Sequence, residues 1–477
     1  MTEVPDHFAD WIATRAETIP DRVALSVGER SWSFAELDAE ISTLARKLGS
    51  AGIGEGDRVA TILHNGILAA MLPHALLRLS ATLVPLNVRL SEAEIAWQIA
   101  DVNPRLVIVE ERTRHLCADA IDTIKLAAII PAPVEFQMSH RSEHVAAIIY
   151  TSGTTGRPKG AMLTLGNFWW SAAGSALNLG VSEDDRWIAC LPLFHVGGLS
   201  IVFRSAIYGT CVVVHDGFDA AAINADIDRG ATLVSVVSVM LERLLDDRAT
   251  ETFPPSFRCA LVGGGPTPRM LLERCISVGL PVAHTYGLTE TCSQAATLSP
   301  ADAIRKLGSA GIPLHPNEIR IDGSEGEILV RGPIVMSGYY NNPEASERVL
   351  EGGWLHTGDI GRLDSEGFLY VLDRRDDLII TGGENVYPAE VESALLAHDS
   401  VVEAAVIGVE DSTWGQRVVA VARVHRAVDQ QDLAAHCRTL LAAYKVPREF
   451  RFTNEPLPRT ASGKIRRALL RDSITKR

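Results

Sequence analysis

The chain has 477 residues, of which 47% are hydrophobic and 22% are charged, and its formal net charge is −14. This composition predicts an ordinary globular protein of about three units with large buried cores. The negative charge argues against nonspecific nucleic-acid binding, so any anionic cofactor must be held by individual Lys and Arg residues.

The sequence carries no signal for export or membrane insertion. Its start, MTEVPDHFAD, is acidic and lacks the basic and then apolar order of a signal peptide. The longest apolar region, 67–86, is interrupted by Pro73, His74 and Arg78, so it predicts a buried helix and a strand. The seven cysteines are odd in number and lack a CxxC spacing, which fits reduced thiols. We therefore expect a cytoplasmic protein without a transmembrane segment.

Strand and helix signals alternate along the first part of the chain. This alternation is typical of α/β proteins. The expected strands are 58–63, 106–110, 210–215 and 233–239, and the expected helices include 34–48 and 92–100.

The sequence pattern changes near Asn317 from alternating strands and helices to short strands. Examples are 327–331 and 368–372, which are joined by Gly and Asp turns. We expect a large N-terminal domain over 1–374, made of two α/β subdomains and a β-rich subdomain that begins near Asn317. A small mobile C-terminal α+β domain is expected over 375–477. The polar stretch DRRDD at 373–377 predicts an exposed hinge near Asp376.

The most informative stretch is TSGTTGRPKG, which directly follows the apolar run 145–150. A buried strand that ends in such a loop is typical of phosphate binding, because glycines let backbone N–H groups approach anionic oxygens. A solvated linker is the alternative. The Walker pattern fails because the lysine follows Pro158, which disfavours a simple P-loop enzyme. The candidate phosphate-binding residues are Thr151, Ser152, Gly153, Thr154, Thr155, Gly156 and Lys159.

Two further motifs predict nucleotide binding. The glycines of GGGPTP at 263–268 leave a flat surface for an adenine ring, although a tight strand-to-helix turn explains them equally well. HTYGLTET at 284–291 groups an aromatic ring, a glycine, a hydroxyl and the carboxylate of Glu290, for which a solvated helix-start acid is the alternative. The candidates are Gly263, Gly264, Gly265, Tyr286, Gly287 and Thr289.

These motifs resemble the adenylate-forming enzymes, which include acyl- and aryl-CoA ligases, peptide-synthetase adenylation domains and firefly-type luciferases. The resemblance covers essentially the whole chain. It implies that a carboxylic acid and ATP, with Mg²⁺, form an acyl-adenylate, from which the thiol of coenzyme A then displaces AMP. It also implies that Tyr286 flanks the adenine, Thr289 contacts phosphate and Glu290 holds Mg²⁺, which usually binds one carboxylate plus substrate phosphates.

The resemblance assigns further roles toward the C-terminus. Asp359 and Arg374 match the pair that binds the ribose hydroxyls, although both types are common in surface turns. Lys464, in LPRTASGKIRR, matches the lysine that contacts the carboxylate and α-phosphate during adenylation and cancels the repulsion of the two anions. A solvated lysine is the alternative for Lys464.

A second arrangement of the C-terminal domain is implied for the step that uses coenzyme A. After rotation about the hinge, Gly382 and Gly383 match a loop that lines the channel for the pantetheine arm. Trp414 matches one wall of that channel, with a plain core aromatic as the alternative.

The segment 191–209 indicates which carboxylic acid is the substrate. It is mostly apolar but contains Arg204. Arg204 either snorkels or pairs with a nearby acid, or it meets a second negative charge on the substrate. The segments 191–209, 285–300 and 306–314 resemble the ligase branch of menaquinone biosynthesis, whose acid is an aromatic dicarboxylate. Further pocket candidates are His195, which matches a residue that gates between the two steps or is a core histidine, and Ser238, Ser293 and Gln294.

An AMP-forming acid:CoA ligase is therefore the predicted activity, with Lys464, Glu290 and His195 as catalytic candidates. The alternatives are a ligase for another aryl or medium-chain acid, a module that loads a carrier protein, and a non-catalytic nucleotide sensor. No carrier segment is evident after Lys464, and retention of the motif residues disfavours the sensor. No nucleic-acid partner is expected, and a homodimer is one option for the oligomeric state.

Overall fold

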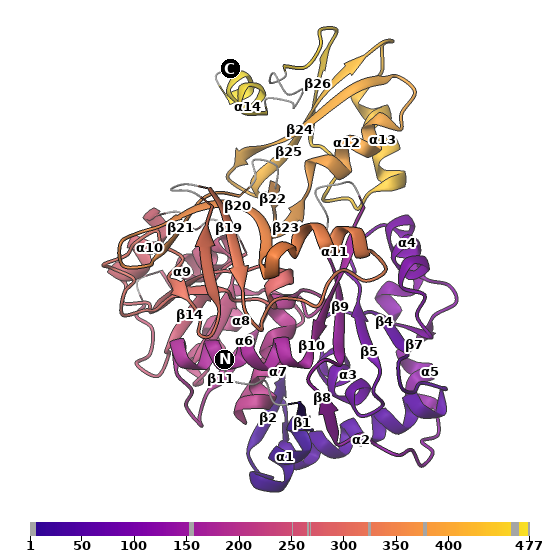
Figure 1. The fold of residues 1–477 in the computed structure, drawn as a ribbon, viewed down its shortest axis with the longest axis vertical. Coiled ribbons are helices and arrows are strands. Elements are labelled where there is room, and N and C mark those ends of the chain that lie inside the picture. Colours follow the sequence, from indigo (N-terminus) through magenta and orange to yellow (C-terminus); the bar gives the residue numbers. More distant parts are fainter. Residues whose placement is uncertain are drawn as a thin grey trace.

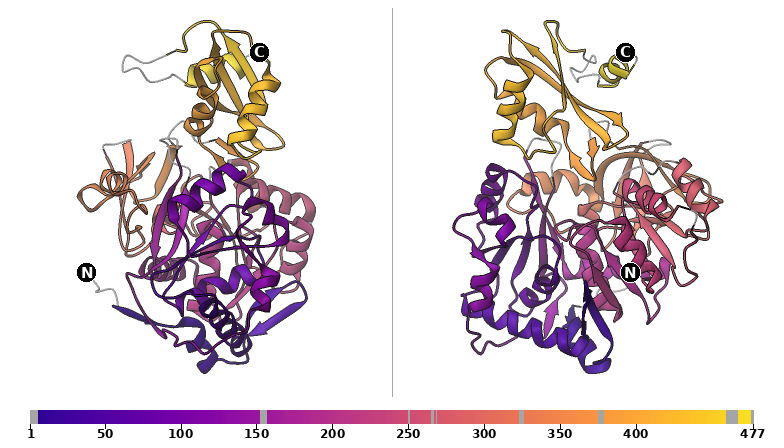
Figure 2. Two further views of the ribbon diagram at one scale, coloured as in Figure 1. Left: turned by 90° about the vertical axis from the view of Figure 1, so that its right-hand side faces the viewer. Right: turned by 180° about the vertical axis from the view of Figure 1, so that it is seen from behind.

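The computed structural model describes residues 6–151, 157–249, 251–264, 267, 269–322, 326–374, 379–458 and 467–475. A large N-terminal body lies beneath a smaller C-terminal unit in Figure 1, and the two further views in Figure 2 show the same separation. The predicted α/β class with a large and a small domain is confirmed. The predicted hinge at Asp376 lies outside the described residues, so the boundary between 374 and 375 stays a prediction.

The first α/β layer is built on a six-stranded sheet in the order β10-β9-β5-β4-β6-β7. Its inner strands run parallel, which requires helical crossovers between them. The apolar region 67–86 supplies one such crossover helix and the next strand, as predicted. The elements are α2 (Phe34–Ser50), β4 (Arg58–Ile62), α3 (Ile67–Leu77), β5 (Thr82–Pro85), α4 (Glu92–Val102), β6 (Leu106–Val109), β7 (Ile121–Asp122), α5 (Thr123–Ala128), β9 (Val145–Thr151) and β10 (Lys159–Thr164).

The second layer is a nine-stranded sheet in the order β17-β16-β15-β14-β13-β11-β12-β2-β3, parallel in its centre and antiparallel at both edges. Its strands are β2 (Val23–Val27), β3 (Arg30–Ser33), β11 (Arg186–Ala189), β12 (Cys211–Val214), β13 (Leu233–Val236), β14 (Cys259–Val262), β15 (Val282–Tyr286), β16 (Ala296–Leu298) and β17 (Ile312–Pro313). The helices of this half are α6 (Leu165–Leu179), α7 (Val196–Tyr208), α8 (Ala220–Asp228), α9 (Ser238–Arg248) and α10 (Arg269–Ser277). A two-stranded sheet of β1 (His7–Ala9) and β8 (Ser139–Arg141), with helix α1 (Trp11–Thr18), completes the base.

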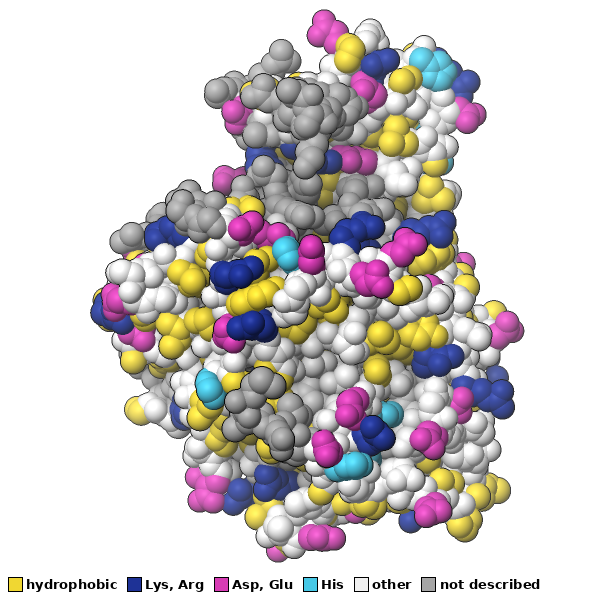
Figure 3. Space-filling model, viewed as in Figure 1, with side chains coloured by type: hydrophobic (Ala, Val, Ile, Leu, Met, Phe, Trp, Pro, Cys, Tyr) yellow, Lys and Arg dark blue, Asp and Glu magenta, His cyan; other side chains and the backbone are white. Residues whose placement is uncertain are grey.

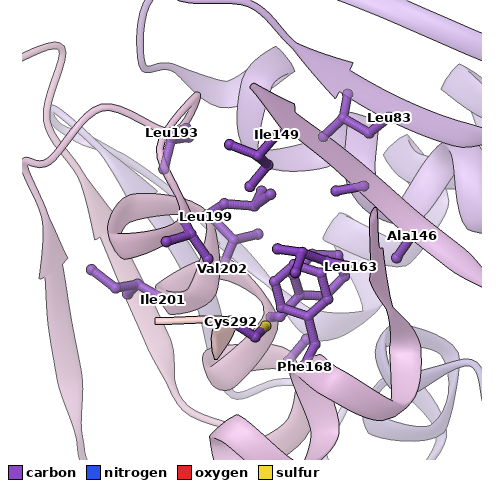
Figure 4. Packing of buried hydrophobic residues seen from close by; sticks show 14 of the residues in the cluster. Leu83, Ala146, Ile149, Leu163, Phe168, Leu193, Leu199, Ile201, Val202 and Cys292 are labelled. Carbon is purple, nitrogen blue, oxygen red and sulfur yellow. The ribbon is translucent and has the colours of Figure 1, made fainter. Parts of the chain in front are cut away.

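Helices α6 and α7 join the two layers. Helix α6 begins in a capping box formed by Thr164 and Asn167, which satisfies backbone donors at its first turn. Phe168 on α6 and Phe203 on α7 stack with ring centroids 4.1 Å apart. Figure 4 shows these helices packed against side chains of β9 and β10, such as Ile149, so a single continuous core crosses the body.

The last two sheets are smaller. The predicted β-rich subdomain contains the antiparallel strands β18 (Glu318–Ile321), β19 (Gly326–Arg331), β20 (Leu355–Leu363) and β21 (Leu369–Arg374), with α11 (Pro343–Val349). The C-terminal unit has its own core around a five-stranded sheet. Its elements are β22 (Ile379–Thr381), β23 (Glu384–Val386), α12 (Pro388–Leu396), β24 (Val401–Asp411), β25 (Gly415–Val424), α13 (Gln430–Leu440), β26 (Glu449–Thr453) and α14 (Arg467–Thr475).

Surface and composition features agree with this architecture. All seven cysteines are free thiols, and six of them are buried. None of the helices in the described ranges combines the length and apolar character that crossing a bilayer needs. On the face shown in Figure 3, acidic and basic side chains are interspersed among the coloured residues rather than gathered by sign.

We expect Phe168→Ala to lower the free energy of unfolding by about 3–5 kcal/mol, because the ring is 1% exposed and its removal leaves a cavity between the two layers. Chemical denaturation followed by far-ultraviolet circular dichroism measures this change. The matched control is Leu177→Ala on the same helix, which is 72% exposed and should cost no more than about 0.5 kcal/mol. Equal effects of the two substitutions would contradict the packing described here.

Candidate active site

A cavity of about 510 Å³ lies where the carboxyl ends of the parallel strands face the C-terminal unit. Open α/β sheets commonly bind ligands at this edge, because the loops that follow neighbouring strands converge there. The cavity collects segments that are far apart in the sequence. The predicted site residues that line it are Thr151, His195, Arg204, Gly263, Gly264, Gly287, Thr289, Glu290, Ser293, Gly382, Gly383 and Trp414.

Other predicted residues are placed differently. Within the described ranges, the predicted residues that do not line the cavity include Lys159, Ser238, Tyr286, Gln294 and Asp359. Ser238 donates to the Thr267 hydroxyl at 3.1 Å, and the Gln294 carbonyl accepts from Thr297 at 3.2 Å. Their contact with an acid thus stays a prediction that this arrangement does not support. The residues that lie outside the described ranges are Ser152, Gly153, Thr154, Thr155, Gly156, Gly265 and Lys464.

The Glu290 carboxylate is held by two hydroxyl donors. Tyr339 donates to its Oε1 at 2.8 Å and Thr151 donates to the same atom at 3.4 Å. Burial and then the nearby Glu290 charge raise the pKa of the Tyr339 phenol, so this hydroxyl keeps its proton and stays a donor. The Lys159 ammonium lies 5.2 Å from the centre of the Tyr339 ring. One tyrosine therefore positions both a candidate metal ligand and a candidate phosphate-binding cation.

This arrangement fits a magnesium ion that is shared with substrate phosphates. Among the described residues, no group of three or more His, Cys, Asp and Glu could form a metal cage. Glu290 instead offers a hard oxygen ligand at the cavity wall, beside the end of β9. A single carboxylate plus phosphate oxygens is the usual coordination of Mg²⁺ in nucleotide enzymes.

The nucleotide candidates lie on β14, β15, β20 and β21. The Tyr286 hydroxyl donates to Asp359 Oδ2 at 2.8 Å in a buried contact. Arg374 stands opposite Asp359 in the register of β20 and β21, so the two backbones are neighbours as the ribose prediction requires. At Gly287, an added Cβ would lie 1.5 Å from the Ser293 carbonyl oxygen. Only glycine therefore allows the two ends of this loop to approach so closely.

Arg204 is a buried cation without a carboxylate partner among the described residues. Its side chain is 1% exposed, yet it reaches the cavity wall. Nη2 donates to the Ser171 hydroxyl at 3.1 Å, Nε has no hydrogen-bond partner, and the guanidinium lies 5.6 Å from the Trp187 ring centre. Burial lowers the pKa of Arg204. A buried charge destabilises a protein unless it is paired. An anion that enters the cavity would therefore offset the free-energy cost of burying Arg204.

His195 connects the body to the C-terminal unit. It stands directly before α7, and its Nε2 lies 3.6 Å from Glu384 Oε2. Burial would raise the pKa of Glu384, but contacts with His195, Arg89 and Asn87 outweigh burial and lower it. Arg89 donates to Glu384 Oε1 at 2.6 Å and Asn87 donates to Oε2 at 3.3 Å. Glu384 is thus a charged anchor between the two units.

The glycine loop and Trp414 close the cavity from above. Gly382 and Gly383 have φ angles of 58° and 82°, which favour glycine. A Cβ on Gly382 would lie 2.9 Å from the Trp414 ring, so the indole packs directly against this backbone. The guanidinium carbon of Arg448 lies 4.2 Å from the centre of the indole ring. The structure thus brings the three residues of the predicted channel together.

Three residues of the site were missed by sequence reasoning. Glu384 follows the two glycines of TGGEN, and a carboxylate beside such a flexible pair was an available signal. Tyr339 lies in GYYNNP, where the tyrosine pair looks like ordinary packing. Ser171 on α6 had no signal, because only the folded chain brings it to Arg204.

The chain matches known families and proteins over its whole length. The AMP-binding enzyme family matches residues 12–340, and the AMP-binding enzyme C-terminal domain matches residues 390–464. A protein named 2-succinylbenzoate–CoA ligase from Geobacillus kaustophilus is 49% identical over 100% of this chain and 99% of that protein. A ligase of the same name from Bacillus cereus is 44% identical over 98% of both.

Two solved structures of one relative differ in how closely they match the structure of this chain. The o-succinylbenzoate CoA synthetase (MenE) from Bacillus subtilis, a double mutant bound with its product analogue OSB-NCoA, has a TM-score of 0.93 at 43% identity. That match covers 98% of this chain and 99% of the other. The same enzyme in complex with the acyl-adenylate intermediate OSB-AMP has a TM-score of 0.76 at 42% identity over 98% of both chains. Identity and coverage are alike in the two matches, so the two TM-scores differ although the same enzyme is compared.

We expect Arg204→Met to raise the free energy of unfolding of the ligand-free protein by roughly 1–2 kcal/mol, because it removes an unpaired buried charge and keeps the volume. The matched control is Arg78→Met. Arg78 is equally buried but is paired with Asp10 at 2.9 Å and with Asp38, so its loss should cost about 3–5 kcal/mol. Thermal and denaturant unfolding measure both changes, and a destabilised Arg204→Met protein would show that this guanidinium has a partner.

Proposed function

The chain belongs to the AMP-binding enzyme family, and we propose that it is an AMP-forming ligase that joins 2-succinylbenzoate to coenzyme A. Its products would be the succinylbenzoyl thioester of coenzyme A, AMP and pyrophosphate. The family assignment rests on matches to both domains and on a relative that is 49% identical over the whole chain. This is the function that the sequence predicted for a ligase of menaquinone biosynthesis.

The buried Arg204 is the observation that carries the choice of acid. 2-Succinylbenzoate has two carboxylates, and activation of the succinyl carboxylate leaves the benzoate carboxylate charged. Such a second anion needs a cation, which Arg204 supplies from the wall of the cavity. A guanidinium can bind a carboxylate through two parallel hydrogen bonds, which also orients the ring. A monocarboxylic fatty acid would leave this charge unpaired.

In the first half-reaction, a succinyl carboxylate oxygen attacks the α-phosphorus of ATP, and the bond to the β-phosphate breaks. Both reactants are anions, so the site must cancel their repulsion and fix their line of approach. Lys159 and the loop that begins at Thr151 would hold the phosphates, and the Tyr286 and Asp359 contact would place the nucleoside. Glu290 would hold Mg²⁺, which neutralises phosphate charge when it is bound. Lys464 would reach the reacting groups from the C-terminal domain.

In the second half-reaction, the thiol sulfur of coenzyme A attacks the acyl carbon, the bond to the AMP oxygen breaks, and the thiol proton is released. The described arrangement suits this step, because Gly382, Gly383 and Trp414 wall the cavity on the side of the C-terminal unit. His195 lies at the junction beside Glu384, where the pantetheine arm would enter. The closer likeness to the relative bound with its product analogue supports this assignment.

The two steps require different arrangements of the C-terminal domain. We infer that residues 375–477 rotate relative to residues 1–374 about a hinge near Asp376. The relative's structures differ in how closely they match this chain, which supports such a motion. Rotation would withdraw the channel loop and deliver Lys464.

Two further expectations complete the proposal. A cytoplasmic location fits seven free thiols, since the cytosol keeps cysteines reduced. A homodimer stays a prediction, which size-exclusion chromatography with light scattering tests.

The experiment that tests the proposal is release of AMP from ATP in the presence of coenzyme A with 2-succinylbenzoate, benzoate, a cinnamate or octanoate. We expect 2-succinylbenzoate to be preferred and Arg204→Met to lower kcat/KM for it by about 100- to 1,000-fold, the effect of losing one partner of a buried ion pair. Arg204→Lys should lose less, since it keeps the charge but not the two-pronged geometry. If the enzyme instead prefers a monocarboxylate and the substitution of Arg204 does not change that activity, the proposed acid is wrong. The ligase chemistry would still be supported.

We expect Lys464→Ala to lower the rate of adenylation by about 100-fold or more, because the charge between the two anions is lost. Pyrophosphate release without coenzyme A measures this step. Thioester formation from preformed acyl-adenylate should stay within about twofold of the wild type, and the exposed Lys125→Ala on α5 should change neither rate. Equal loss in both steps would show that the assigned role of Lys464 is wrong.

A further inference from the structure

A buried cluster of three charges joins the C-terminal unit to the body, and its central residue, Lys445, also lines the cavity. The Lys445 ammonium donates to Glu94 Oε1 at 2.6 Å and to Glu390 Oε1 at 2.8 Å. Glu94 belongs to α4 in the body, whereas Glu390 lies in the first turn of α12 in the C-terminal unit. Lys445 follows α13, which contacts α4 at the right of Figure 1. One ammonium thus bridges two units.

The cluster is well shielded from water. The side chains of Lys445, Glu94 and Glu390 are 3%, 9% and 8% exposed. Burial would lower the pKa of Lys445, but the two carboxylates outweigh burial and raise it, so the lysine is charged. Burial raises the pKa of Glu390, and Lys445 offsets only part of that rise. Two acids therefore depend on one cation, and removing that cation would leave them facing each other.

Glu94 is held rigidly for this contact. The capping box at the start of α4 uses its other carboxylate oxygen, Oε2, which accepts from the Ser91 backbone N–H at 2.9 Å and from the Ser91 hydroxyl at 2.8 Å. These bonds leave Oε1 directed at Lys445. The body therefore presents a fixed acceptor, and the C-terminal unit must bring its lysine to it.

The apolar surroundings place the cluster at the docking surface. Ala442, just before Lys445, is buried in the core of the six-stranded sheet, and Tyr444 packs against the same core. Burial raises the pKa of Tyr444 well above its usual range. The segment 441–446 is thus the part of the C-terminal unit that enters the body when Gly382 and Trp414 line the cavity.

Rotation of the C-terminal unit affects the two ion pairs differently. Lys445 and Glu390 lie in the same unit and would move together. Lys445 and Glu94 are separated by 351 positions in the sequence and belong to different units, so rotation would part them. The Glu94 contact is therefore specific to the arrangement described here.

We propose that Lys445 is a positioning residue for thioester formation, because its bridge from Glu390 to Glu94 holds the C-terminal domain in the arrangement that completes the pantetheine channel. The proposal rests on the proposed two-step function. It assigns Lys445 no contact with the reacting atoms. It also makes the bridge dispensable for adenylation, which would take place after the domain has turned away.

The test measures the two half-reactions separately in the full chain. We expect Lys445→Met to slow thioester formation from preformed succinylbenzoyl-adenylate at saturating coenzyme A by about tenfold or more, since two buried carboxylates lose their shared cation. The rate of pyrophosphate release without coenzyme A should stay within about twofold. Lys445→Arg should restore much of the thioester rate, because it keeps the charge at the interface.

A second variant removes the partner in the body. Glu94→Gln should reduce the thioester rate in the same direction, and the double variant with Lys445→Met should lose less than the product of the two single effects, since contacting residues are not additive. The matched control is Lys306→Met. Lys306 also bridges two carboxylates, Asp364 at 2.7 Å and Glu366, but it lies within the body, so its loss should not favour one half-reaction.

The outcomes separate this proposal from the assigned reaction. Equal loss of both half-reactions in Lys445→Met, or no loss in either, overturns the role of Lys445 while the wild-type activity still supports the ligase. A raised KM for coenzyme A with an unchanged maximal thioester rate also overturns it, because Lys445 would then bind the cofactor. A wild type without activity on 2-succinylbenzoate overturns the proposed function. Thermal unfolding of each variant identifies any loss that is merely due to misfolding.

Discussion

The packing of α6 and α7 between the two large sheets is the contact on which the rest of the molecule depends. Phe168 and Phe203 stack at its centre, and the same core reaches from β9 to the β-rich strands. The packed pair of helices sets the distance between the sheets. It therefore determines where the carboxyl ends of β9, β13, β14 and β15 meet. Side chains that follow those strands can converge on a single cavity only while the packing of α6 and α7 is rigid.

A charge that is buried in the packing of α6 and α7 raises the free energy of the folded protein. Arg204 projects from α7, the helix that packs the core, and within the described residues it faces no carboxylate. In the proposed function, an anionic substrate would offset this free-energy cost when it binds. Selectivity for a dicarboxylic acid would follow from this same burial. Stability and substrate choice would then be in conflict at Arg204, as they commonly are at functional sites.

The cavity is completed by a unit with its own core. Strands β22 to β26 fold around a separate cluster, and the proposed rotation requires a C-terminal unit with such a core of its own. Among the described residues, the contacts between the units include ion pairs beside the apolar packing of Ala442: Glu384 meets Arg89 and His195, and Lys445 meets Glu94. Ion pairs of this kind depend steeply on distance and desolvation, so they favour one arrangement over another without blocking the exchange.

The local patterns of the sequence predicted the fold class, the glycine motifs that line the cavity and the charge of Arg204 among apolar neighbours, while the phosphate loop stays a prediction. Each of these is readable because it depends on residues close together in the chain: a strand that ends in glycines, or a cation among apolar neighbours. Tertiary structure alone decided that Tyr339 holds Glu290, that Ser171 meets Arg204 and that Lys445 bridges to Glu94. These pairs join positions far apart in the sequence, and local periodicity carries no information about which distant side chains the packing of helices and sheets will bring together.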